Sequence, residues 1–232
     1  MDFAAQIHAL SNFDADGTDD SISGEDFDEH AAQWMTDGAK EVITQLPSKF
    51  KEKCATATEL DDSTTVMDMD STGDILFVTR LSADSSGFYT PCRKIPSMYG
   101  GMAEPDSGHM FNEPSVTDPV YWIDANTSGS DGKSSTLYVK PIPTANQKAY
   151  VHHVKYPVFT AGDTETYDVS QKNIIANFPD EAEYLVVLYA AIKATEYMML
   201  SEEDQEVYAP QLATLKQDYA QGLATLKGGQ QG

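Results

Sequence analysis

Apolar residues recur at three- and four-residue steps near the start of the chain, and this spacing predicts helices. A short helix is expected over 1–10, and an amphipathic one over 27–46. The motif Ser-Gly-Glu-Asp at 23–26 resembles a capping box, with Asp in place of Glu, at the start of the second helix. The apolar positions of that helix are Phe27, Ala31, Trp34, Met35, Gly38, Val42 and Leu46.

The last third of the chain also has helical spacing. Apolar residues cover several sides of the predicted helix over 178–200, so it is expected to be buried on more than one face. A second helix is expected to follow the cap residue Ser201 and to be stopped by Gly228 and Gly229. Pro210 lies inside its pattern, so the helix is expected either to start there or to kink there. Its apolar seam consists of Tyr208, Leu212, Leu215, Tyr219, Leu223 and Leu226.

Branched and aromatic residues in short runs, separated by Gly, Asn, Asp and Ser, fill the middle of the chain and predict β-strands. The expected strands are 74–81, 87–95, 120–124, 135–141 and 148–157. The segment 96–119 has no clear period, but it contains three Met, a Tyr and a Phe. A long irregular segment of this kind is typical of a functional loop or an interface.

These patterns predict an α+β protein in which the N-terminal and C-terminal helices pack as a small bundle beside a central antiparallel β-rich region. The expected segments are 1–55, 56–160 and 161–232, and the first and last are expected to form one compact unit.

Charge narrows the range of functions. The 232 residues include 37 acidic and 15 basic side chains, a net charge of −22, so a sequence-reading DNA-binding protein is disfavoured. Solubility, or a halophilic or marine origin, is the favoured explanation of such acidity, but an acidic surface would also let DNA slide past without sticking. No stretch is long and apolar enough to span a membrane, and the N-terminus lacks the pattern of a signal peptide. Cys54 and Cys92 form no metal or disulfide framework and favour a reducing compartment.

The acidic stretch 14–25 raises the question of calcium binding. Taking Asp14 as the first position of a calcium loop places Asp16, Thr18 and Glu25 at further ligand positions. However, Asp19 occupies the position where such a loop needs Gly for its turn. The stretch is therefore either a calcium site or an acidic turn that caps the next helix, and the missing Gly favours the turn.

No motif indicates catalysis, a cofactor or a metal site, and we expect no enzyme. Adjacent strand residues point to opposite faces, so His152 and His153 cannot share one metal. The other histidines, at 8, 30 and 109, have no partner at ligand spacing. Arg80 and Arg93 are expected to be partners in structural ion pairs rather than phosphate clamps. No phosphate-binding loop or nucleophile elbow occurs.

The order of the segments resembles a known family. It runs through AAQWMTDGAKEVITQLP, ILFVTRL, YTPCRKIP, LYVKPIPT, VHHVKYPVF and IIANFPDEAEYLVVLYAAIKAT. This order is similar to that of head-to-tail connector (neck adaptor) structural proteins of tailed bacteriophages. The resemblance implies a virion protein, made in the host cytoplasm, that forms a ring of twelve copies between the portal protein and the downstream tail or neck proteins. It also implies that DNA passes through the ring, and that the helix ending at Leu226 and the tail 228–232 reach the portal.

Ring closure requires contact between two different faces of each subunit. The two apolar helical zones and the segment 96–119 are the candidates for these faces. Two alternatives stay open: another tail component, such as a tube terminator or a baseplate part, and a calcium-binding interaction module built on Asp14, Asp16, Thr18 and Glu25. A hydrolase with an unrecognised site is the least favoured alternative.

Overall fold

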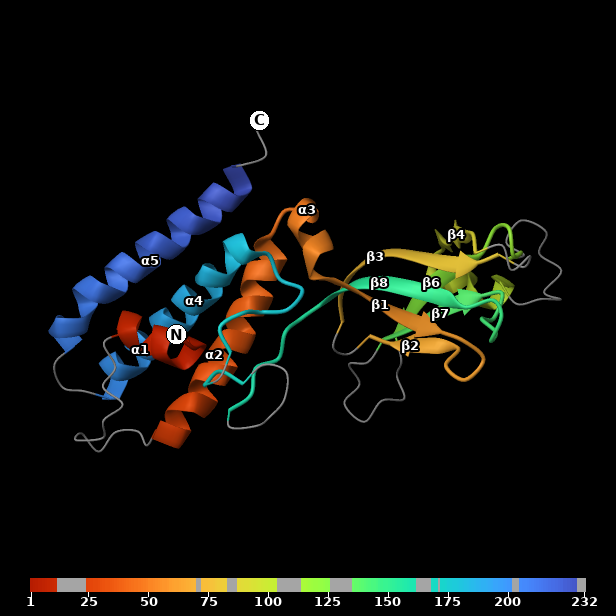
Figure 1. Cartoon of the computed structure of the whole chain (residues 1–232). Helices are drawn as coiled ribbons and strands as arrows, with labels where there is room; N and C mark the ends of the chain where they lie inside the picture. Colours follow the sequence, from red (N-terminus) through yellow and green to blue (C-terminus); the bar gives the residue numbers. More distant parts are fainter. Residues whose placement is uncertain are drawn as a thin grey trace. The chain divides into compact units, whose positions relative to one another are not determined.

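Two compact units make up the protein, as a computed structural model shows (Figure 1). The helical unit comprises Met1–Cys54 and Tyr156–Gly232, and the β unit is Ala55–Lys155. Helices at both ends and sheets in the middle confirm the predicted α+β class. The structure describes residues 1–11, 24–69, 72–82, 87–103, 114–125, 135–161, 168–170, 172–201 and 205–228.

Helix α4 lies at the centre of the helical unit and packs against α1, α2 and α5 (Figure 1). Its residues 185–188 are all buried, as the apolar run on several sides predicts. Its contact with α2 is close, because a Cβ placed on Gly38 would lie 2.9 Å from Tyr189 Cδ1. The helices are α1 (Phe3–Ser11), α2 (Gly24–Gln45), α3 (Ser48–Lys51), α4 (Asp180–Ser201) and α5 (Gln205–Gly228), and the short 3₁₀ turn η1 (Glu52–Cys54) follows α3.

The predicted helices are confirmed with small shifts of their ends. Phe3 and Ile7 of α1 are buried, and Leu10 is half-buried. Helix α5 begins before Pro210 rather than at it, so the prediction of a start there was wrong. Pro210 lies beyond the first turn, so it removes one internal hydrogen bond, and the helix continues through it.

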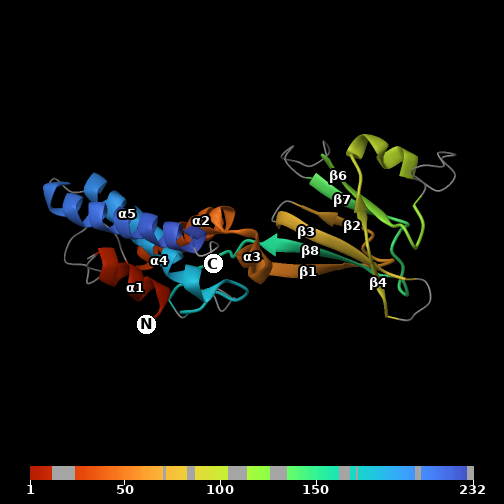
Figure 2. The same ribbon diagram turned by 90° about the horizontal axis from the view of Figure 1, so that it is seen from above.

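The β unit contains two four-stranded sheets, which Figure 2 shows as separate layers. The first sheet has the order β1-β8-β3-β4 and is antiparallel throughout, whereas in the second, β2-β7-β6-β5, strand β5 runs parallel to β6. The strands are β1 (Ala55–Leu60), β2 (Val66–Asp68), β3 (Thr72–Leu81), β4 (Tyr89–Pro91), β5 (Arg93–Lys94), β6 (Val120–Ala125), β7 (Ser135–Lys140) and β8 (Ala149–Lys155).

Apolar side chains from both sheets meet in a shared core. Val78 of β3 and Val151 of β8 are opposite one another, and both are buried. Because side chains alternate between the two faces of a strand, their neighbours Phe77 and His152 lie on the other face of the first sheet. The buried cluster consists of Leu60, Met67, Val78, Tyr121, Leu137, Val139, Ala149 and Val151.

The single strand predicted over 87–95 is wrong, because the chain changes sheets there. Cys92 N donates to Val78 O at 2.8 Å, and Arg93 N donates to Pro119 O at 2.8 Å. Strand β4 therefore belongs to the first sheet and β5 to the second. After β5 comes a second 3₁₀ helix, η2 (Ser97–Ala103), in the segment 96–119 that was expected to be irregular.

Candidate functional site

The outer face of the first sheet carries an exposed group of aromatic side chains, which we call the aromatic face. Phe77 of β3 is 49% exposed and Tyr89 of β4 is 52% exposed. Together with Thr79, Tyr150 and His152 they line a shallow hollow of about 370 Å³. Register places His152 opposite Phe77 and Tyr150 opposite Thr79, so these side chains share one face.

Contacts between rings hold the aromatic face in place. The rings of Phe77 and His152 stack with centroids 4.1 Å apart, and those of Tyr89 and Tyr150 meet edge to face at 5.6 Å. Burial lowers the pKa of His152, and the electrostatic effect of the adjacent His153 lowers it further. His152 is therefore uncharged at neutral pH, so the face is apolar.

A charged cluster borders the aromatic face at Glu59 of β1. The Tyr150 hydroxyl donates to Glu59 Oε2 at 2.7 Å, and Lys148 forms an ion pair with the same carboxylate. The hydrogen bond to Glu59 raises the pKa of Tyr150 to about 12. Bonds from Lys148 and Tyr150 lower the pKa of Glu59. Glu59, Tyr150 and Lys148 are thus joined at one edge of the aromatic face, and the negative charge of Glu59 is balanced by the positive charge of Lys148.

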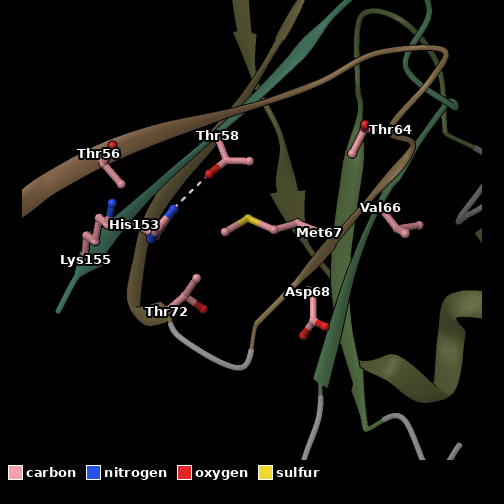
Figure 3. A pocket seen from close by; sticks show the side chains of 9 residues that line it. All are labelled: Thr56, Thr58, Thr64, Val66, Met67, Asp68, Thr72, His153 and Lys155. Carbon is pink, nitrogen blue, oxygen red and sulfur yellow. Dashed lines mark hydrogen bonds between the residues drawn. The ribbon is translucent and has the colours of Figure 1, made fainter. Parts of the chain in front are cut away.

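A polar pocket of about 390 Å³ lies in the β unit, lined by residues of β1, β2, β3 and β8 (Figure 3). His153 Nδ1 lies 3.1 Å from the carbonyl oxygen of Val154, which can only accept, so Nδ1 carries the proton. His153 Nε2 forms a hydrogen bond with the Thr58 hydroxyl at 3.0 Å (Figure 3). The lining residues are Thr56, Thr58, Thr64, Val66, Met67, Asp68, Thr72, His153 and Lys155.

This geometry favours a structural role for His153. Both ring nitrogens are engaged, one by a backbone carbonyl and one by a hydroxyl, and the residue is only 4% exposed. A general base needs a free nitrogen within reach of a substrate proton. Among the described residues of the lining there is no serine or cysteine that His153 could activate. The described part of the pocket therefore presents threonine hydroxyls, Asp68 and Lys155 around a histidine that is held by hydrogen bonds.

Comparison with known protein families decides the classification. The sequence model of the SU10 adaptor protein family matches residues 4–232, which is nearly the whole chain. The chain belongs to the SU10 adaptor protein family. Membership confirms the resemblance to phage head-to-tail adaptor proteins and makes the chain a structural adaptor protein of a bacteriophage. A search of curated proteins found no match.

The arginines of this SU10 adaptor have structural roles. Arg93 forms an exposed ion pair with Asp118 at 3.0 Å, as predicted. Arg80 is instead 1% exposed, and its Nη2 donates to the carbonyl of Ile142 at 3.2 Å and to Gln147 Oε1 at 3.1 Å. The expectation of an ion pair was wrong for Arg80 among the residues described, since its partners there are neutral.

The described histidines of the SU10 adaptor pack against neighbouring residues. His152 and His153 lie on opposite faces, as strand alternation predicts. The His8 ring packs against Phe27 at a tilt, with centroids 4.0 Å apart, and the His30 ring stacks on Trp34 at 5.6 Å. His109, Asp14, Asp16 and Thr18 lie outside the described residues, as does the side chain of Glu25. Within the described part, no three His, Cys, Asp or Glu side chains are grouped as a metal site requires.

Both cysteines are free thiols. Burial raises the pKa of Cys54 to about 11 and that of Cys92 to about 12. Since the thiolate is the reactive form, neither side chain is prepared for nucleophilic chemistry. Among the described helices, none has the length and apolar character to cross a bilayer.

Proposed function

We propose that this adaptor forms a closed ring of twelve copies between the portal protein and the downstream tail or neck proteins, and that the ring keeps the DNA channel continuous. Family membership supports an adaptor in preference to a tube terminator or a baseplate part. The observation that carries the self-assembly is the aromatic face, where Phe77 and Tyr89 are each about half exposed. Aromatic rings exposed together are enriched at protein interfaces.

In a closed ring, the aromatic face would contact a neighbouring copy of the chain. A heterologous contact joins two different surfaces, so the face of one subunit would receive another part of the next. Its uncharged character suits this role, because burying an unpaired charge at an interface is costly. The exposed side chain of Met98 in η2, 76% exposed, belongs to the segment 96–119, the other candidate contact in the β unit.

The two units differ in net charge, and this difference supports different roles for them. The helical unit has 24 acidic and 8 basic residues, a net charge of −16, and the β unit has 13 and 7, a net charge of −6. A channel for DNA needs a negative wall so that phosphates are repelled. We assign the channel-facing surface to the helical unit and contacts between proteins mainly to the β unit. No catalytic step is part of this proposal.

Native mass spectrometry of the purified chain tests the assembly, alone and with portal protein. Wild type is expected to form a closed oligomer, and Phe77→Ser is expected to weaken it. Ile142→Ser is the matched control, because Ile142 is also in the β unit and is 50% exposed, close to the 49% of Phe77. A wild-type chain that stays monomeric with and without portal protein would reject the ring. Equal assembly of Phe77→Ser and wild type would reject the aromatic face as the contact.

A further inference from the structure

The β unit has two uncharged surfaces on opposite sides. The aromatic face is the outer face of the first sheet, because Phe77 points away from the core that the two sheets share. On the second sheet, Leu137 belongs to this core, whereas its neighbour Tyr138 packs with Trp122 in a separate cluster. That cluster is therefore on the outer face of the second sheet, and η2 covers it (Figure 2). The aromatic face and η2 thus lie on opposite sides of one compact unit.

Helix η2 presents one side to the second sheet and another side to solvent. Gly100 and Ala103 are buried, and Ala103 belongs to the cluster that contains Trp122. Met98 is 76% exposed and Tyr99 is 37% exposed, so these two side chains form the free side of η2. Because Gly100 lies directly against the Trp122 ring, η2 is held close to the sheet and presents Met98 and Tyr99 in a defined position.

Charge restricts where two copies of the chain can meet. Each copy has 37 acidic and 15 basic side chains, so two copies repel one another least at surfaces without charge. None of the seven residues of η2 is charged. The five side chains that line the hollow of the aromatic face are also uncharged at neutral pH, since burial keeps the His152 ring neutral. The two surfaces therefore match electrostatically.

The side chains of the two surfaces also suit one another. The hollow of about 370 Å³ is lined mainly by aromatic rings, of which Phe77 and Tyr89 are about half exposed. A methionine side chain is unbranched and adapts to an irregular apolar hollow, and its sulfur makes favourable contacts with aromatic rings. Tyr99 adds a further ring whose hydroxyl can stay at the wet rim of the contact.

We propose that Met98 and Tyr99 of η2 in one copy pack into the aromatic face of the next copy, an inference that rests on the ring proposed above. The contact is heterologous, because it joins two different surfaces. Since these surfaces lie on opposite sides of one compact unit, each copy binds one neighbour on each side, as a closed ring requires. Pairing of two aromatic faces would instead stop at a dimer.

Two blocked variants, measured by native mass spectrometry separately and as an equal mixture, test this pairing. Phe77→Asp keeps η2 intact and Met98→Asp keeps the aromatic face intact, and each places in the contact a charge that is costly to bury. Each variant alone is expected to associate about tenfold more weakly than wild type, or weaker still. The mixture is expected to form one-to-one heterodimers, because η2 of the first variant fits the aromatic face of the second. These heterodimers should not grow, since both remaining surfaces are blocked.

Ile142→Asp is the matched control, because it adds the same charge at another exposed position of the β unit and should assemble like wild type. Circular dichroism checks that all three variants are folded. A cross-linking experiment avoids introduced charge altogether: Met98→Cys and Thr79→Cys chains, mixed and treated with a short bis-maleimide, should give a cross-linked dimer that neither chain gives alone. The native thiols of Cys54 and Cys92 should contribute little, because burial raises the pKa of both.

The outcomes separate this contact from the ring itself. Dimers of Met98→Asp alone would mean that two aromatic faces pair with each other. A mixture that gives neither heterodimers nor the cross-linked dimer would mean that η2 does not bind the aromatic face. Either result, obtained with a wild-type chain that forms rings, overturns the contact and leaves the ring. A wild-type chain that stays monomeric with and without portal protein overturns both.

Discussion

Gly100 of η2 lies directly against the indole ring of Trp122 in β6, and a Cβ built on Gly100 would come within 2.7 Å of Trp122 Nε1. Trp122 is 6% exposed and stacks on Tyr138 of β7, with centroids 5.3 Å apart and an angle of 12°. A Cβ at position 100 would therefore collide with a ring that is buried and already stacked on another. Because only a glycine fits, this contact attaches η2 to the second sheet.

Gly100→Ala should lower the free energy of unfolding of the β unit by about 1–3 kcal/mol, the usual cost of overpacking. The adjacent Gly101 is the matched control, because a Cβ there would meet nothing within 4 Å. Urea unfolding followed by Trp122 fluorescence in a Trp34→Phe background measures both variants. Equal stability of Gly100→Ala and Gly101→Ala would contradict the close packing.

Acid should weaken the β unit through His152. Because burial holds its folded-state pKa below the ordinary 6.5, the unfolded chain binds more protons between the two values. The free energy of unfolding should therefore fall as pH drops from 7 through 6.5 toward the folded-state pKa. Unfolding curves at several pH values for wild type and His152→Phe, which keeps an aromatic ring against Phe77, should differ in this window. Parallel pH profiles would remove His152 as the cause.

The bond between Tyr150 and Glu59 should be visible in alkaline titration. The pKa of Tyr150 is about 12 in the wild type because of this bond, and Glu59→Gln should bring it toward the ordinary 10. Removing the negative charge makes the phenolate easier to form. Assigned NMR signals of the Tyr150 ring, followed against pH, measure the change. An unchanged Tyr150 titration in the variant would show that Glu59 does not control it.

The two thiols should resist alkylation in the folded protein. Burial raises the pKa of Cys54 to about 11 and of Cys92 to about 12, so the thiolate is rare at pH values near neutral. Labelling with iodoacetamide should be slow until denaturant is added, and Cys92→Ser assigns the remaining signal to Cys54. Rapid labelling of either residue without denaturant would mean that its burial is incomplete.

Local patterns were sufficient for the helices. Helix α2 was predicted from apolar spacing over 27–46, and its residues Phe27, Met35 and Val42 are buried as expected. The run over 178–200 predicted burial on several sides, and α4 is the helix that α1, α2 and α5 all contact. In both cases the spacing of side chains along one helix decides which of them are buried, and that spacing is present in the sequence.

Strand partners could not be read in the same way. Strands β1 and β2 were not predicted, because Leu60 and Met67 are their only buried side chains, and they pair with β8 and β7 far along the chain. The change of sheet at Cys92 depends on Val78 and Pro119, which are distant in sequence. Such choices follow from tertiary contacts rather than from local preference.

Only part of the aromatic face could be predicted from the sequence. Alternation along 74–81 and 148–157 places Phe77 and His152 on the face opposite to Val78 and Val151. Which of the two faces the second sheet covers depends on the packing of both sheets, and the sequence shows no sign of it.

Electron cryomicroscopy of the intact phage particle tests the central proposal most directly. We expect this chain as a closed ring between the head and the tail, with Phe77 and Tyr89 buried between neighbouring copies and the helical unit toward the DNA path. A particle in which the chain is absent from that junction, or is present there only as separate copies that do not touch, would contradict the proposal.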